Sequence, residues 1–162
     1  MNELKEHSEK YRAKLKKTLD DLDSDKVQLL LDNIIECWKN NNTIYICGNG
    51  GSAGNANHIA NDLLYGAGLT NGIGIHIESL SVNPSVITCL ANDVGYNKIY
   101  SEQIKVKGKK NDLLIVLSGS GNSTNVINAI EAAHKKQMNT FSLLGFDGGA
   151  SKKISKNYLH FN

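Results

Sequence analysis

Residues 43–66 read TIYICGNGGSAGNANHIANDLLYG and decide how the rest of the chain folds. The stretch begins with an apolar run at residues 44–47, whose β-branched and aromatic side chains predict a buried strand. Three of the next four residues, 48–51, are glycines, which permit backbone conformations closed to other residues. Apolar residues then recur at helical spacing as far as Leu64. We therefore predict a strand, a glycine turn and a helix.

This geometry favours an anion as ligand, because a helix start aims unpaired backbone N–H groups and the helix dipole at one point. The glycines match neither the P-loop, which needs a Lys, nor the pattern G-x-G-x-x-G. A turn that merely requires glycines is the alternative. His58 and Asp62 lie four residues apart, so they share one face of the predicted helix. A His/carboxylate pair above an anion loop favours an active site.

Length and composition limit the classes of protein that fit. A chain of 162 residues suits one domain with a single core, and a formal net charge of +2 gives no case for nucleic-acid or membrane binding. No segment approaches the ~18 apolar residues of a membrane span, and the start is too charged for a signal peptide. We expect a cytoplasmic protein. Its cysteines should be free thiols, with Cys47 and Cys89 buried in apolar runs.

Residues 1–40 are expected to form helices that precede the α/β core at 43–161. The pattern over residues 2–19 is mostly polar and leaves only a thin apolar stripe, which suits packing against another subunit. The stripe consists of Leu4, Tyr11, Leu15 and Leu19.

Further strands and helices alternate after the opening stretch. The run at 112–117 is apolar throughout, as expected of a parallel strand covered on both faces. This alternation predicts an α/β sandwich on a parallel sheet, with ligands outside the carboxyl ends of the strands. The other strands are predicted at 73–77, 140–144 and 158–161, helices at 84–90, 98–107 and from Ser123, and loops at 66–72 and 91–97.

A serine-rich loop, SGSGNST at 118–124, follows the apolar strand. Its hydroxyls and the N–H groups before the next helix suit a phosphate monoester held by neutral donors. The alternative is a surface loop whose serines only cap the helix. A nucleophilic serine is not indicated, because nothing matches G-x-S-x-G.

Three segments resemble the sugar isomerase (SIS) domain family and its phosphoheptose isomerase branch. They are GNGGSAGNANHIANDL at 48–63, ANDVGYN at 91–97 and LLIVLSGSGNSTNVINAI at 113–130. The resemblance runs from about Leu29 to Phe161. It implies a three-layer, flavodoxin-like sandwich with a five-stranded parallel sheet, and a homotetramer with sites between subunits. The implied activity is conversion of sedoheptulose 7-phosphate to D-glycero-D-manno-heptose 7-phosphate, for the heptose of bacterial surface polysaccharides.

The resemblance also implies roles for individual residues. Contacts to the sugar would come from Asn49, Gly50 and Gly51, and contacts to its hydroxyls from Asn92 and Asp93. The phosphate would be held by Ser118, Gly119, Ser120 and Ser123. His58 matches a zinc ligand, and Asp62 stands where the family has a Glu that binds zinc and acts as the base.

The sequence departs from the family pattern at three places. Asp62 is one methylene shorter than Glu, and Gly119 replaces a usual Thr. The family also continues into a helix that supplies a Gln and a second His, whereas this sequence stops at Asn162. The expected zinc set is therefore incomplete, since two ligands do not make a tetrahedral site. His160 lies too early to be that second His and is expected to be structural.

These departures leave a second function open. The chain could be a catalytically silent SIS domain that binds a sugar phosphate or a protein partner, as relatives that associate with the replication initiator do. The sugar is open as well, because SIS proteins handle several phosphosugars and no segment here indicates the carbon count.

Overall fold

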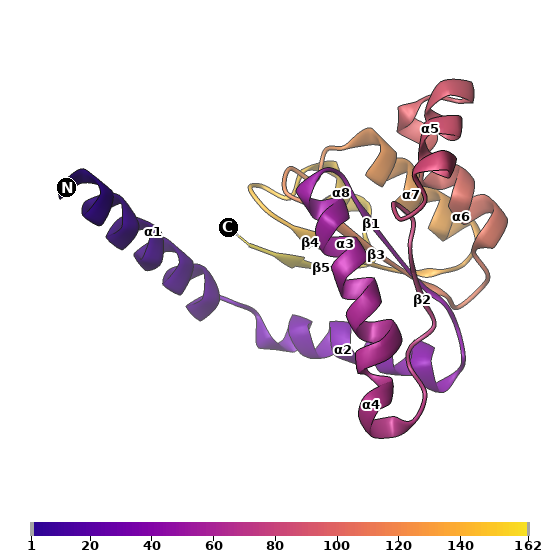
Figure 1. The fold of residues 1–162 in the computed structure, drawn as a ribbon, viewed down its shortest axis with the longest axis horizontal. Helices are drawn as coiled ribbons and strands as arrows, with labels where there is room; N and C mark the ends of the chain where they lie inside the picture. Colours follow the sequence, from indigo (N-terminus) through magenta and orange to yellow (C-terminus); the bar gives the residue numbers. More distant parts are fainter. Residues whose placement is uncertain (1, 162) are drawn as a thin grey trace.

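The computed structural model describes residues 2–161 and contains one parallel sheet with helices on both faces (Figure 1). The strand order is β2-β1-β3-β4-β5, the flavodoxin-like order. The predicted five-stranded sandwich is thus confirmed. The strands are β1 Ile44–Gly48, β2 Ile77–Ser79, β3 Leu113–Ser118, β4 Asn139–Leu144 and β5 Asn157–His160.

The helices connect the strands in the manner of a parallel sheet. A single π-helical turn, Asp62–Gly66, continues α3, and a 3₁₀ turn, Tyr96–Lys98, precedes α6. The α-helices are α1 Asn2–Asp20, α2 Ser24–Lys39, α3 Gly51–Asn61, α4 Gly68–Asn71, α5 Pro84–Asp93, α6 Ser101–Lys107, α7 Thr124–Lys135 and α8 Gly149–Ile154.

Side-chain alternation along β1 divides the core into two layers. Ile44 and Ile46 pack in one cluster with Ala56 of α3, while Tyr45 packs in the other with Ile130 of α7. Successive strand residues point to opposite faces, so one short apolar run anchors helices on both sides. This arrangement places the starts of α3 and α7 at the same edge of the sheet.

The segment before β2 differs from the prediction. A strand was expected at 73–77 and a loop at 66–72, but β2 is Ile77–Ser79 and α4 lies within the expected loop. Residues 73–76 instead pass close to the π-helical turn that continues α3, where the Ile75 N–H donates to the Leu63 carbonyl at 3.1 Å. A Cβ on Gly74 would lie 1.6 Å from the Leu64 carbonyl oxygen. Glycine is needed there for close approach rather than for a strand.

The prediction that Cys89 is buried is wrong, whereas Cys47 is buried as expected. Cys89 lies on α5, which extends to Asp93 through residues assigned to a loop from sequence, and its thiol faces the Asp93 carboxylate at 3.4 Å. Burial raises the pKa of Cys47 to about 12. All three cysteines are free thiols.

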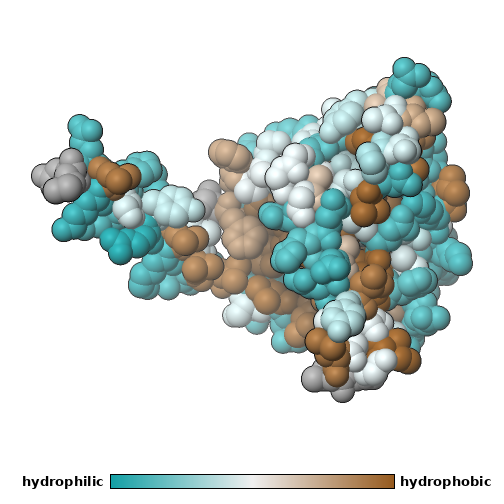
Figure 2. Space-filling model, in the orientation of Figure 1, coloured by the Kyte–Doolittle hydropathy of each residue, from teal (hydrophilic) through white to brown (hydrophobic). Residues whose placement is uncertain are grey.

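The helix α1 projects from the body, and its apolar stripe is uncovered within one chain. Figure 2 shows hydrophobic side chains on α1 and along the part of the body that it adjoins. Among the described residues, no helix combines the length and hydropathy needed to cross a membrane. The exposed fractions are 78% for Leu4, 63% for Tyr11, 47% for Leu15 and 59% for Leu19.

Gly74→Ala should destabilise the fold by about 2–3 kcal/mol, because the added methyl forces the backbone of residues 73–76 away from Leu64. Gly66→Ala is the matched control, since its added Cβ meets nothing within 4 Å. Urea unfolding measures both. Equal free energies of unfolding in the two variants would contradict the close approach.

Candidate active site

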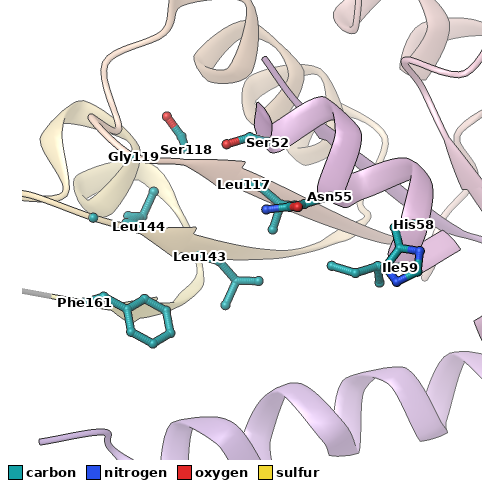
Figure 3. A pocket seen from close by; sticks show the side chains of 11 residues that line it. Ser52, Asn55, His58, Ile59, Leu117, Ser118, Gly119, Leu143, Leu144 and Phe161 are labelled. Carbon is teal, nitrogen blue, oxygen red and sulfur yellow. The ribbon is translucent and has the colours of Figure 1, made fainter. Parts of the chain in front are cut away.

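A cleft of about 460 Å³ lies between α3 and the carboxyl ends of β3 and β4 (Figure 3). It brings together three residues predicted from sequence: His58, Ser118 and Gly119. The other residues that line it are Ser52, Asn55, Ile59, Leu117, Leu143, Leu144, Gly145 and Phe161.

The polar side chains run along the cleft, with the Asn55 amide between its two ends. Figure 3 shows the hydroxyls of Ser52 and Ser118 near one another at one end and the His58 ring at the other. Apolar side chains, among them Leu143 and Phe161, line the side facing α3. An elongated ligand can therefore have an anionic group at the serine end and a reacting group at the His58 end.

The serine loop presents hydroxyls and a helix start. Ser118 is buried, and its hydroxyl accepts a hydrogen bond from the Gly121 N–H at 3.1 Å. The exposed Ser120 hydroxyl accepts from the Asn122 N–H at 3.2 Å. Ser123 is the N-cap of α7, yet its side chain makes no capping bond. The Val126 and Ile127 N–H groups donate to the Ser123 carbonyl, both at 3.0 Å. This leaves the N–H groups of Thr124 and Asn125 at the start of α7 as the donors suited to an anion.

The glycine turn has the backbone that the sequence predicts. Gly50 has φ of 56° and precedes α3, which begins at Gly51. The Asn49 carbonyl accepts from the Ser52 N–H at 3.0 Å, which closes the turn. Added Cβ atoms on Gly50 or Gly51 would meet nothing within 4 Å, so the turn is open on its outer side.

Asn49 is held by a network that sequence reasoning did not find. Its amide exchanges two hydrogen bonds with the Asn125 amide, both 2.8 Å long. The Tyr96 hydroxyl donates to Asn49 Oδ1 at 3.2 Å, and the Tyr100 hydroxyl donates to the Gly48 carbonyl at 2.5 Å. Burial, and then the neighbouring Cys47 and Tyr96, raise the pKa of Tyr100, which keeps it a donor. Only the position of Asn125, directly after the serine loop, could have indicated this pairing.

His58 and Asp62 form the pair expected from their spacing. His58 Nε2 lies 3.4 Å from Asp62 Oδ2, and the side chains are 77% and 60% exposed. Asp62 begins the π-helical turn, a local irregularity that often occurs at functional sites. Asp62 itself does not line the cleft, so His58 connects the pair to it.

The described residues do not supply a complete zinc site. Among them, no group of three or more His, Cys, Asp or Glu side chains converges where a metal ion could bind. His58 and Asp62 offer two donors, and tetrahedral zinc needs three or four protein ligands.

Asn92 and Asp93 lie apart from the cleft, at the end of α5. Asn92 donates to Asp93 Oδ1 at 2.8 Å, and this bond, with a further one from Cys89, lowers the pKa of Asp93. The segment reaches the site through Tyr96, whose hydroxyl bonds Asn49. A role for Asn92 and Asp93 in holding sugar hydroxyls therefore stays a prediction.

The fold and the cleft define a parallel α/β domain with a ligand-sized cleft at the carboxyl edge of its sheet, and comparison with known proteins identifies its family. The family model described as "SIS domain" matches residues 8–145, so the chain belongs to the SIS domain family.

Relatives within that family are phosphoheptose isomerases. The phosphoheptose isomerase of Helicobacter pylori is 41% identical over 90% of this chain and 74% of its own length. That of Chlorobaculum parvum is 39% identical over 86% of this chain and 67% of its own. The structure of the enzyme from Neisseria gonorrhoeae superposes with a TM-score of 0.84 at 31% identity, covering 96% of this chain and 80% of that one. The chain therefore belongs to the phosphoheptose isomerase branch.

Tyr100→Phe should lower the free energy of unfolding by about 1–3 kcal/mol, because the Gly48 carbonyl loses its buried donor. Tyr65→Phe, at an exposed tyrosine on the π-helical turn, is the control and should leave stability unchanged. Thermal and urea unfolding provide the measurement. A Tyr100→Phe protein as stable as the control would mean that the network does not hold the turn.

Proposed function

We propose that this chain is an aldose–ketose isomerase that converts sedoheptulose 7-phosphate to D-glycero-D-manno-heptose 7-phosphate. The observation that carries the proposal is a cleft with serine hydroxyls at one end and His58 at the other, where His58 is paired with the Asp62 carboxylate just outside the cleft. It occurs in a chain 41% identical to a phosphoheptose isomerase. The product supplies heptose to bacterial surface polysaccharides.

The phosphate binds at the serine loop and fixes the orientation of the sugar. Ser120 and Ser123 present hydroxyls there, and the start of α7 adds N–H groups and the positive end of its dipole. No charged donor is needed for a monoester bound this way. The carbon chain then extends along the cleft, so that its first two carbons reach the end marked by His58.

The reaction moves hydrogen between two adjacent carbons. Asp62, as the base, removes a proton from C1 of the ketose, and the C–H electron pair forms a C1–C2 double bond while the C2 carbonyl becomes an enediolate oxygen. His58 carries a proton between the two oxygens. Return of the first proton to C2 leaves the carbonyl on C1, so the atoms balance without a redox partner.

The proposed reaction steps do not depend on zinc, although the site offers two donors for it. A bound zinc ion would polarise the sugar carbonyl. His58 and Asp62 are the described residues that would hold it, and the remaining donors would have to come from outside the described residues of one chain. The steps above therefore rest on side chains alone.

We further propose that the protein is a cytoplasmic homotetramer. The support is the apolar stripe of α1, whose members are exposed in one chain although an isolated helix of this length is marginal in water. A partner helix from another copy would cover the stripe.

The second candidate is a silent SIS domain that binds sugar phosphate without turnover. The two-donor set favours it, because a complete metal site is not present among the described residues. Binding of sedoheptulose 7-phosphate with no conversion, with and without added zinc, would support this alternative.

Asp62→Asn should reduce turnover of sedoheptulose 7-phosphate at least ~100-fold, because the amide cannot accept the C1 proton. Binding of the substrate should be retained, since Asp62 lies outside the phosphate end. Asp21→Asn, at an exposed carboxylate beyond α1, is the control and should keep full activity. Retained turnover in Asp62→Asn would place the base elsewhere.

Ser120→Ala should weaken binding of sedoheptulose 7-phosphate roughly tenfold, because a hydrogen bond to a charged ligand is lost. Calorimetric titration measures the dissociation constant. Ser85→Ala, on the exposed side of α5, provides the matched control. An unchanged constant for Ser120→Ala would remove this hydroxyl from the phosphate site.

A further inference from the structure

Phe146, in the loop after β4, has a backbone conformation that its side chain does not favour. Its φ is 46°, and the other described non-glycine residues with positive φ are Asn41, Asn111 and Gln137. Asparagine tolerates this region. Gln137 follows α7, where the Met138 N–H reaches back to the Ala133 carbonyl at 3.0 Å in a common helix ending. No such local reason applies to Phe146.

The surrounding structure fixes Phe146 in this conformation. The Gly148 N–H donates to the Gly145 carbonyl at 2.9 Å, so Phe146 occupies the second position of a tight turn, where positive φ usually selects glycine. His160 Nε2 donates to the Phe146 carbonyl at 2.7 Å, which leaves Nδ1 to accept from Lys152 Nζ at 3.2 Å. His160 is thus structural, as expected, and its role is to fix this turn.

The turn presents the Phe146 ring beside the serine loop. The Gly145 N–H donates to the Gly119 carbonyl at 3.0 Å, which ties the loops after β3 and β4 together. A Cβ on Gly119 would lie 3.7 Å from ring atom Cε2 of Phe146, an ordinary van der Waals contact. The ring is nevertheless 78% exposed. Burial of the side chain within the chain therefore does not offset the unfavourable backbone conformation of Phe146. Residues with strained backbones of this kind cluster where ligands bind.

We propose that Phe146 is a specificity-determining residue whose ring packs against the carbon atoms next to the phosphate of a ligand on the serine loop. The inference rests on the proposed function of that loop. Hydroxyl and N–H donors bind inorganic phosphate and a phosphate ester alike. An apolar ring beside them contacts only the ester, because only the ester has carbon atoms to cover. Phe146 thereby favours sugar phosphates over free phosphate, the commoner anion.

Phe146→Gly tests this role, because glycine suits the turn and removes the ring. The variant should bind sedoheptulose 7-phosphate roughly fivefold to tenfold more weakly, as expected for loss of about 1 kcal/mol of apolar contact. Its affinity for inorganic phosphate should stay within about twofold of wild type, since the donors are unchanged. Its urea midpoint should rise as the positive φ is relieved.

Gln137→Gly is the matched control, since it relieves a φ of 58° at the far end of α7. It should raise the urea midpoint and leave both affinities unchanged. Titration calorimetry with each ligand gives the affinities.

Three outcomes would overturn the inference. Unchanged affinity of Phe146→Gly for the ester overturns it alone and leaves the proposed function intact. An equal loss for ester and inorganic phosphate also overturns it, because the ring would then only shape the loop. If wild-type protein binds neither ligand, the phosphate site and the proposed function fail together with it.

Discussion

The paired amides of Asn49 and Asn125 are the interaction on which the site depends. They join the turn after β1 to the start of α7 after β3, at the point where the strand order reverses direction. In open parallel sheets this is where ligands bind. Two reciprocal bonds fix the separation of the glycine turn and the serine loop. Tyr96 extends the network to the segment that carries Asn92 and Asp93.

The two ends of α3 lie at different parts of the candidate site. Its first turn lies beside the serine loop, and its end carries His58 and, through the π-helical turn, Asp62. In the proposed function, one helix thus sets the distance between the phosphate and the carbons that react. A substrate anchored at one end gains orientation at the other, which is how remote binding assists proton transfer. The exposure of Asp62 in a single chain is consistent with a site completed by further residues.

Elements with a clear local pattern in the sequence were predicted correctly. Elements whose position depends on contacts between distant residues were not. The apolar run of β3 and the glycine turn carry their own signals, and the structure has them where expected. The strand expected at 73–77 failed because Gly74 is constrained by Leu64, which no local pattern shows. Cys89 was misplaced because Ile87, Leu90 and Ala91 take the positions of α5 that pack against the core and leave the thiol exposed.

In the candidate site too, residues with a local sequence signal were predicted and those placed by contacts between distant segments were not. His58 and Asp62 were found because their spacing in sequence is their spacing on a helix. The pairing of Asn49 with Asn125, 76 residues apart, and the position of Phe146 beside Gly119 depend on how loops meet at the sheet edge. Tertiary packing decides such contacts, so a single sequence does not predict them.

Exchange of the C1 hydrogens of sedoheptulose 7-phosphate in D₂O, followed by proton NMR, tests the central claim most directly. While the enediolate persists, the proton that Asp62 took from C1 exchanges with solvent before a proton is delivered to carbon, so the account predicts that the C1 signals fade as aldose appears. Both processes should require the intact pair of His58 and Asp62. Unchanged C1 signals in the presence of bound substrate would contradict the account and leave a domain that binds its ligand without reacting with it.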